Sequence, residues 1–395
     1  MKKKILSVIV CAAAILSLTA CAKNEDPFAG LTTSQGTSST PNGTSSKPSS
    51  KPVSSATQSS NTPANSSAPE ESKPEESSVP ENKNEIDWDS VPYADELDFM
   101  TEDVDGGVKI TAYLGTDTVV NIPDTIDGKK VVMISGSSKT AHYGFDNKNV
   151  TDIKIPDSVT EIVKLNCGNT LESIVLPNGL KKIGDDTFYE CSTLKSIEIP
   201  NTVTEIGEKA FYKSGLESLT LPDSVKVFCG DMIAGCTNLK EVRLPKDIRV
   251  AEASFSSGRG TSYTMSFYLD GCTSLTNTDF LKNVKPSDTA NDSRFAVSFV
   301  GCEGLTSVTF PEGIEEVGAI SGCDNLTEIT LPNSVTTFGG APLSSFLKKI
   351  TLSDNLKSLE AGAFLGCSPD LEIVYKGKTY KPNQEPNLIK AINGN

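Results

Sequence analysis

The sequence predicts an elongated solenoid in which short parallel β-strands stack coil upon coil, and three observations predict it. The stretches that begin at Leu171, Leu194 and Leu216 repeat with a period of 22 or 23 residues, and apolar residues fall at the same positions in each. Each copy places a proline directly after a short apolar alternation. Residues 32–80 consist mainly of Ser, Thr, Pro, Asn and Gln and cannot form a core. A fixed period of about 20 to 50 residues is typical of solenoids, so we expect about ten or eleven coils after an unfolded segment.

The N-terminal residues have the organisation of an export signal. Lys2 to Lys4 precede an apolar stretch from Ile5 to Leu18 that is too short to span a bilayer. The Leu-Thr-Ala-Cys motif that ends at Cys21 resembles the bacterial lipobox. That resemblance implies cleavage after Ala20 and a diacylglyceryl group on Cys21, which would anchor the exported chain to the cell membrane, facing outward at the cell surface. The alternative is an ordinary secretory signal with an incidental cysteine.

The composition divides the chain into successive segments. Residues 1–20 are the signal peptide, and residues 21–90 are the lipidated cysteine and a Ser/Thr/Pro-rich linker that we expect to be disordered. The linker serves as a spacer, and glycosylation of its hydroxyl side chains is left open. Residues 91–149 are expected to form a hairpin cap and a first coil, residues 150–370 the repeats, and residues 371–395 a C-terminal cap.

Within one repeat, the apolar residues predict which parts of the coil are extended. In the repeat that begins at Leu171, Ile174 and Leu176 face one side of a short strand, because alternate residues of a strand share a face. Pro177 ends that strand, since it has no backbone N–H to donate. Leu180 and Ile183 form a second short extended segment that ends at Gly184, and Phe188 and Cys191 point inward from the final turn. Coils stacked about 4.8 Å apart then bury all of them and place a parallel sheet along one face.

The complete frame is L-x-x-I-x-I-P-x-x-V-x-x-I-G-x-x-A-F, and residues 194–211 match it almost position for position. This frame resembles the BspA-like leucine-rich-repeat family. The resemblance covers about residues 97–380, with an opening segment at 108–131 and a closing strand at 374–378. It implies a right-handed leucine-rich-repeat solenoid of parallel strands with short turns or helices, capped at both ends, and a role in adhesion or interaction. Extra residues interrupt the frame between Leu239 and Leu305, where the register of two coils stays open.

Cysteines recur in phase with the repeat. They lie three residues before the leucine that opens the next coil at Cys191, Cys236, Cys272, Cys302 and Cys323. This spacing predicts a small buried slot in every turn, with free thiols inside it. The alternative is a disulfide between neighbouring coils, because an exported chain with an even number of cysteines commonly has disulfides. A zinc site is not expected, since no Cys-x-x-Cys occurs and the only histidine is His142.

No pattern in the sequence indicates catalysis, a metal or a cofactor. His142 has no nucleophile or acid beside it in a recognisable motif. The Asp-Val-Asp-Gly-Gly segment at 103–107 starts like a calcium loop, but Leu114 stands where the loop needs a glutamate, so we expect a hairpin turn. The formal net charge of −15 disfavours nucleic acid. We therefore expect neither an enzyme nor a small-molecule substrate.

The remaining candidates are surface residues that could bind a macromolecule. On the outward face of the first strand they are Glu198, Thr220 and Arg243. In the two insertions they are Phe255, Arg259, Tyr263, Tyr268 and Arg294. Insertions in a solenoid often form its binding face, and the alternative is that Phe267, Tyr268 and Phe295 pack into altered coils. A surface poor in aromatic residues favours a protein over a glycan as the partner. A structural envelope protein without a ligand is the alternative function.

Overall fold

The computed structural model describes residues 86–136, 144–145, 149–251, 253–257, 260–286, 294–311, 313–339 and 343–394, with the backbone alone at 253–257, 260–266 and 294. The predicted signal peptide, Cys21, almost all of the linker and His142 lie outside these residues. Residues Asp87–Asn395 form one compact unit. This unit is a parallel β-solenoid of about ten turns, so the predicted fold class is confirmed.

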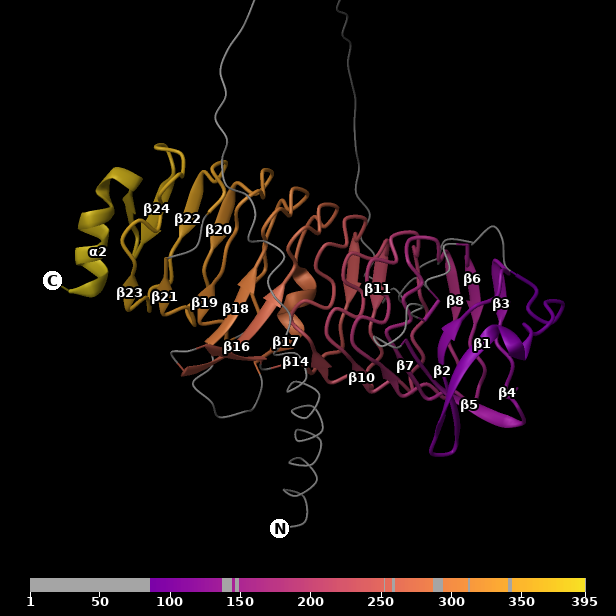
Figure 1. The fold of residues 1–395 in the computed structure, drawn as a ribbon. Helices are drawn as coiled ribbons and strands as arrows, with labels where there is room; N and C mark the ends of the chain where they lie inside the picture. The colour runs from indigo at the N-terminus through magenta and orange to yellow at the C-terminus, as the bar shows by residue number, and fades with distance from the viewer. Residues whose placement is uncertain are drawn as a thin grey trace, which may run out of the picture. The chain divides into compact units, whose positions relative to one another are not determined.

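Short parallel strands stand in a row along one face of the solenoid, in three separate sheets (Figure 1). The central residue of these strands is buried and its neighbours are more exposed, because successive side chains point to opposite faces. Ile153, Leu219 and Ile329 are such central residues. The row consists of β3 (Val119–Asn121), β6 (Asp152–Lys154), β8 (Ser173–Val175), β11 (Ser218–Thr220), β13 (Glu241–Arg243), β20 (Glu328–Thr330), β22 (Lys349–Thr351) and β24 (Glu372–Tyr375).

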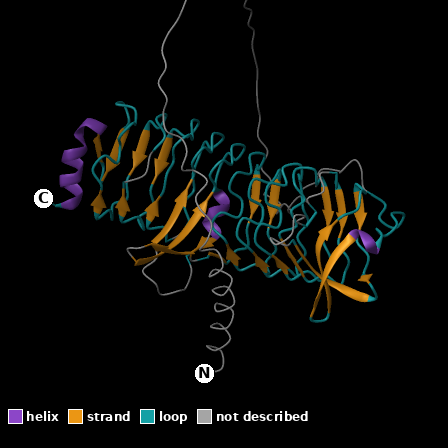
Figure 2. Cartoon of the chain, in the orientation of Figure 1, coloured by secondary structure: helices purple, strands orange, loops and turns teal. Residues whose placement is uncertain are grey.

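The second extended segment of each coil also pairs with its neighbours, so a second row of strands lies along another face (Figure 2), where the sequence predicted a sheet along one face only. Ile162, Ile183 and Ile206 occupy the same place in successive coils, and the extended backbone around each pairs in parallel with the next. The first part of this row consists of β2 (Gly107–Tyr113), β5 (Lys129–Ser135), β7 (Glu161–Val163), β9 (Lys182–Ile183) and β10 (Glu205–Ile206). It continues in a separate sheet with β12 (Val227–Phe228), β14 (Ile248–Val250) and β17 (Val284–Lys285).

The two interrupted coils enlarge the second row. The first insertion is an antiparallel hairpin of β15 (Ala253–Ser257) and β16 (Gly260–Tyr268). The second insertion leads into β18 (Arg294–Ser298), and β18 pairs in parallel with the last five residues of β16. The row then continues through β19 (Glu316–Val317), β21 (Thr337–Phe338) and β23 (Ser358–Leu359). The insertions therefore extend a sheet of the solenoid, and the 3-10 helix η2 (Asp279–Asn283) lies between them in the chain.

The core is continuous along the whole unit. The fully buried rings of Phe188 and Phe211 stack with centroids 5.5 Å apart, and those of Phe228 and Phe267 with centroids 4.2 Å apart. The predicted burial of the cysteine slot is confirmed for Cys191, Cys236, Cys272, Cys302 and Cys323. Cys167, which lies four residues before the leucine of the next coil, is buried as well.

Both ends of the solenoid carry antiparallel caps. At the N-terminal end, β1 (Phe99–Val104) and β2 form the hairpin expected at the Asp-Gly pair, after the 3-10 helix η1 (Glu96–Asp98). The short strand β4 (Thr125–Ile126) folds back on β5.

At the C-terminal end, β25 (Lys378–Tyr380) pairs antiparallel with β24. The 3-10 helix η3 (Pro382–Gln384) then leads into helix α2 (Glu385–Asn393), which packs on β23 and buries Leu388. Among the described residues, no helix has the length and apolar character needed to cross a membrane.

Candidate interaction surfaces

The outward face of the first row holds three of the predicted binding residues. Glu198, Thr220 and Arg243 stand at the same position of three successive coils, and all three are exposed. Thr220 and Arg243 are direct neighbours in the pairing of β11 with β13. The coil of Glu198 is not assigned a strand at this point. The structure therefore brings these residues into one line, as their shared position in the repeat predicts.

Ion pairs run along this face and connect adjacent coils. Arg243 Nε lies 2.8 Å from Glu241 Oε1 within one strand, and Lys240 Nζ lies 2.8 Å from Glu217 Oε2 of the preceding coil. Exposed pairs of this kind are each worth about 0.2–1 kcal/mol. The face is consequently polar and carries both signs of charge.

The insertions hold the other predicted residues, and the side chain of only one of them, Tyr268, lies in the described part of the chain. Phe255 lies on β15, Tyr263 on β16 and Arg294 on β18, where Arg294 pairs with Thr264, the residue after Tyr263. Their side chains and Arg259 lie outside the described part of the chain. Tyr268, the last residue of β16, is half-buried.

The alternative for the insertions, packing into the coils, holds for two aromatic residues. Phe267 is fully buried against Phe228, and Phe295 is 1% exposed. Both alternate with more exposed neighbours along their strands, as the two-residue period of a strand requires. Phe267 and Phe295 therefore anchor the widened sheet to the core and are not available to a partner.

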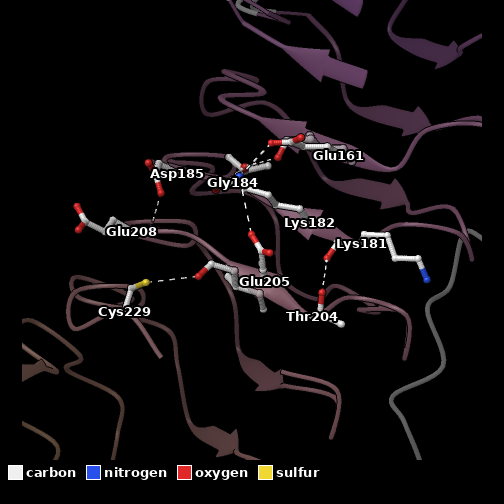
Figure 3. A network of polar contacts seen from close by, with 12 residues as sticks. Glu161, Lys181, Lys182, Gly184, Asp185, Thr204, Glu205, Glu208 and Cys229 are labelled. Atoms are coloured by element: carbon white, nitrogen blue, oxygen red, sulfur yellow. Dashed lines mark hydrogen bonds and ion pairs between the residues drawn. The ribbon is translucent and has the colours of Figure 1, made fainter. Parts of the chain in front are cut away.

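A charge ladder crosses the second row (Figure 3). Lys182 on β9 stands in register between Glu161 on β7 and Glu205 on β10. Its Nζ is 3.2 Å from Glu161 Oε1 and 3.9 Å from Glu205 Oε2. Opposite charges directly across a sheet stabilise that register, by about 0.2–1 kcal/mol for each pair. The ladder therefore supports the stacking of the coils.

Carboxylates gather in the turns that follow this ladder. Asp185 Oδ1 accepts a hydrogen bond of 2.9 Å from the backbone N–H of Glu208 in the next coil. Burial raises the pKa values of the Asp186, Glu208 and Asp231 carboxyl groups above their ordinary range, although Lys164 and Lys209 oppose the increase at Asp186.

These turns do not form a metal centre. Within the described residues, no group of three or more His, Cys, Asp or Glu side chains is arranged to hold a metal ion. The hydrogen bond that the Glu208 backbone N–H donates to Asp185 gives the cluster a structural role.

The sequence analysis missed a row of exposed apolar side chains in the turns. Tyr189, Val300 and Leu365 are exposed and Tyr212 is half-buried, and each lies two residues before the cysteine slot or the serine that replaces it. The rings of Tyr189 and Tyr212 are stacked with centroids 5.3 Å apart and 11° between their planes. Their mutual stacking occupies one face of each ring. The signal in the sequence that could have indicated these side chains is the Phe-Tyr pair, which recurs at 188–189 and 211–212.

These features define the class of the protein: a solenoid of short repeats whose coils share one core and whose strands present polar faces. The family model for the BspA type leucine rich repeat region matches the chain in 6 copies, at residues 138–254, 165–285 and 266–381. The chain belongs to this family, which confirms the resemblance found in the repeat frame.

Similar solved structures are bacterial leucine-rich-repeat proteins. A leucine-rich repeat protein from Bacteroides ovatus is 23% identical, covers 70% of this chain and 80% of its own, and superposes with a TM-score of 0.49. A leucine-rich repeat protein of T. pallidum is 24% identical over 60% of this chain and 91% of its own, with a TM-score of 0.42. A leucine-rich cell surface protein from Faecalibacterium prausnitzii is 22% identical over 76% of this chain and 98% of its own, with a TM-score of 0.38. No curated protein sequence matches the chain.

Proposed function

We propose that this protein is an exported bacterial lipoprotein whose solenoid binds a protein partner outside the cell without catalysing a reaction, in adhesion or interaction. BspA-type leucine-rich-repeat proteins are generally exported or surface proteins of bacteria. The lipobox-like motif that ends at Cys21 supports an anchor in the membrane, and two acyl chains hold a protein there stably. The linker then acts as a spacer between the membrane and the solenoid.

The main support for a binding role is the long hairpin formed by β15 and β16. Most strands of the second row have two or three residues, whereas β16 has nine. A regular coil does not need this extension, and residues that bind partners concentrate on segments held out from a rigid scaffold. Phe255, Arg259, Tyr263 and Arg294 are therefore the proposed contact residues.

The chemistry of the surface favours a protein over a glycan. The exposed strand faces alternate small polar residues with paired charges such as Glu241 and Arg243. The stacked tyrosines Tyr189 and Tyr212 turn their faces to each other. A partner with mixed charges and exposed apolar groups complements such a surface.

The test is a shortened hairpin. Ser254 and Tyr263 are directly paired, so replacing residues 255–262 by Asn-Gly joins them through a two-residue turn. The variant keeps Thr264 to Tyr268 on β18 and keeps the buried Phe267 in place. We expect it to unfold at nearly the same urea concentration as the natural chain and to lose at least about tenfold in affinity for a captured surface protein.

A matched control separates the hairpin from the strand face. Exchanging Glu241 and Arg243 keeps their ion pair and alters only the outward face of β13. We expect this variant to lose less than about threefold in affinity, because exposed charges on the strand face contribute little beside the hairpin. If the natural chain shows no saturable protein partner and its deletion causes an envelope defect, the alternative of a structural envelope protein replaces the proposal.

A further inference from the structure

The thiols of the cysteine slot make two kinds of contact, and those of Cys302 and Cys323 make both, because they also interact with each other. In four of the later coils the thiol donates a hydrogen bond to a backbone carbonyl of the preceding coil: Cys236 to Phe211, Cys272 to Ile233, Cys302 to Leu269 and Cys323 to Phe299. In Cys167 and Cys191, the sulfur atoms face each other across neighbouring coils, 2.9 Å apart. Both side chains are fully buried.

The position of this pair fits a covalent link. Stacked coils lie about 4.8 Å apart, and disulfides join residues whose Cα atoms are about 4.4–6.8 Å apart, so two cysteines at one position of adjacent coils need no backbone movement to be bridged. The next coil carries Ser214, which contacts the Cys236 thiol at 3.3 Å. A serine thus separates the Cys167–Cys191 pair from the later cysteines.

The burial of the two thiols determines when a disulfide between them can form. Burial raises the pKa of the Cys167 thiol well above its ordinary value, so the reactive thiolate is scarce once the coils have packed together. Oxidation therefore takes place while the chain is folding, and the finished bond is shielded from reductants by the same burial.

We propose that Cys167 and Cys191 form a disulfide between neighbouring coils when the chain folds in an oxidising compartment. The oxidant is a disulfide-bearing molecule, such as oxidised glutathione or a thiol oxidoreductase. The Cys191 thiolate attacks one sulfur of that disulfide, which forms a mixed disulfide and releases one thiol. The Cys167 thiolate then attacks the Cys191 sulfur and releases the second thiol. Two electrons pass to the oxidant, and both cysteine protons end on the released thiols.

The full chain tests this directly. It is unfolded, refolded in a glutathione redox buffer, denatured in acid, and alkylated without reductant. We expect two fewer alkylated thiols than in a sample treated with dithiothreitol, and a non-reducing tryptic digest in which peptide 165–181 is joined to peptide 183–195. We also expect the midpoint of thermal unfolding to fall by several degrees when the bond is reduced.

Variants make the assignment specific. Cys167→Ser is expected to leave Cys191 open to alkylation and to remove the joined peptides. The matched control is Cys236→Ser combined with Cys272→Ser, which alters the same slot in two other coils and is expected to leave the joined peptides unchanged. The peptide map of the natural chain does not depend on either variant folding. Complete alkylation of the refolded natural chain, or joined peptides from other cysteines, would overturn the proposal, and neither result bears on partner binding.

Discussion

At the scale of single residues, the turn before each cysteine slot depends on a backbone shape that glycine adopts readily. Gly322 has a φ of 72°, and a Cβ added to it would lie 3.2 Å from Gly301 Cα in the preceding coil. Gly106, in the turn of the β1–β2 hairpin, has a φ of 83° but nothing within 4 Å of an added Cβ. The two positions separate backbone strain from crowding between coils.

We expect Gly106→Ala to lower the free energy of unfolding by about 1 kcal/mol, since it adds only left-handed strain. Gly322→Ala should lower it by about 2 kcal/mol or more, because the methyl group also pushes two coils apart. Urea unfolding of the two variants measures the difference. Equal losses would show that the coils tolerate a methyl group at this contact.

The carboxyl group of Glu208 gives the turns a dependence on pH. Burial, with the charges of Asp231 and Asp185, raises its pKa above the ordinary value. The folded protein then holds this proton more tightly than the unfolded chain. The ionised group therefore destabilises the fold above its folded-state pKa, and the penalty disappears as the pH falls below the unfolded-state pKa.

Glu208→Gln is accordingly expected to increase the free energy of unfolding at pH 7 and to leave it unchanged near pH 3. The comparison is Glu205→Gln, which removes a partner of Lys182 and should bring no gain at pH 7. Urea midpoints measured across this pH range check both variants. A Glu208→Gln gain that is the same at both pH values would contradict burial as its cause.

At the scale of the elements, the solenoid has to protect its last coil. Helix α2 covers the edge of β23 and buries Leu388, while β25 closes the edge of β24. An uncovered parallel edge offers unpaired backbone groups to another chain. The C-terminal cap therefore has a role in solubility as well as in stability.

We expect Leu388→Ala to lower the free energy of unfolding by about 2–3 kcal/mol, and removal of residues 385–395 to cause association of the chain. Size-exclusion chromatography at several concentrations measures the association. Ile389→Ala, at a position that is only partly buried, is the control and should cost less. A truncated chain that stays monomeric would show that β23 needs no cover.

At the scale of the whole molecule, export and anchoring are expected to depend on a single side chain. Cys21→Ala should remove the site of lipid attachment and shift the protein from the membrane fraction to the soluble fraction. Cys11→Ala, within the apolar stretch of the signal, is the matched control and should leave the anchored fraction unchanged. Cell fractionation with detection of the acylated N-terminus is the measurement. Recovery of the natural chain in the soluble fraction, without an acylated N-terminus, would favour the ordinary secretory signal.

Periodicity alone determined the main features of this protein. Leucines, prolines and cysteines that recur every 22 or 23 residues specify a coil, a buried face and a buried slot, because every copy must meet its neighbour in the same register. The outward line of Glu198, Thr220 and Arg243 follows from the same regularity. Each of these features depends only on the residues of one coil and on a contact with the next coil that is the same along the solenoid.

The features that depend on contacts outside the regular repeat could be determined only from the tertiary structure. The insertions share no period, so the sequence could not place β16 beside β18 or bury Phe267 while leaving Tyr268 half-exposed. The pairing of the second extended segments into sheets and the approach of the Cys167 and Cys191 sulfur atoms also emerged only from the packing. These outcomes depend on distances between coils and on rotamers, and an apolar pattern along one chain specifies neither.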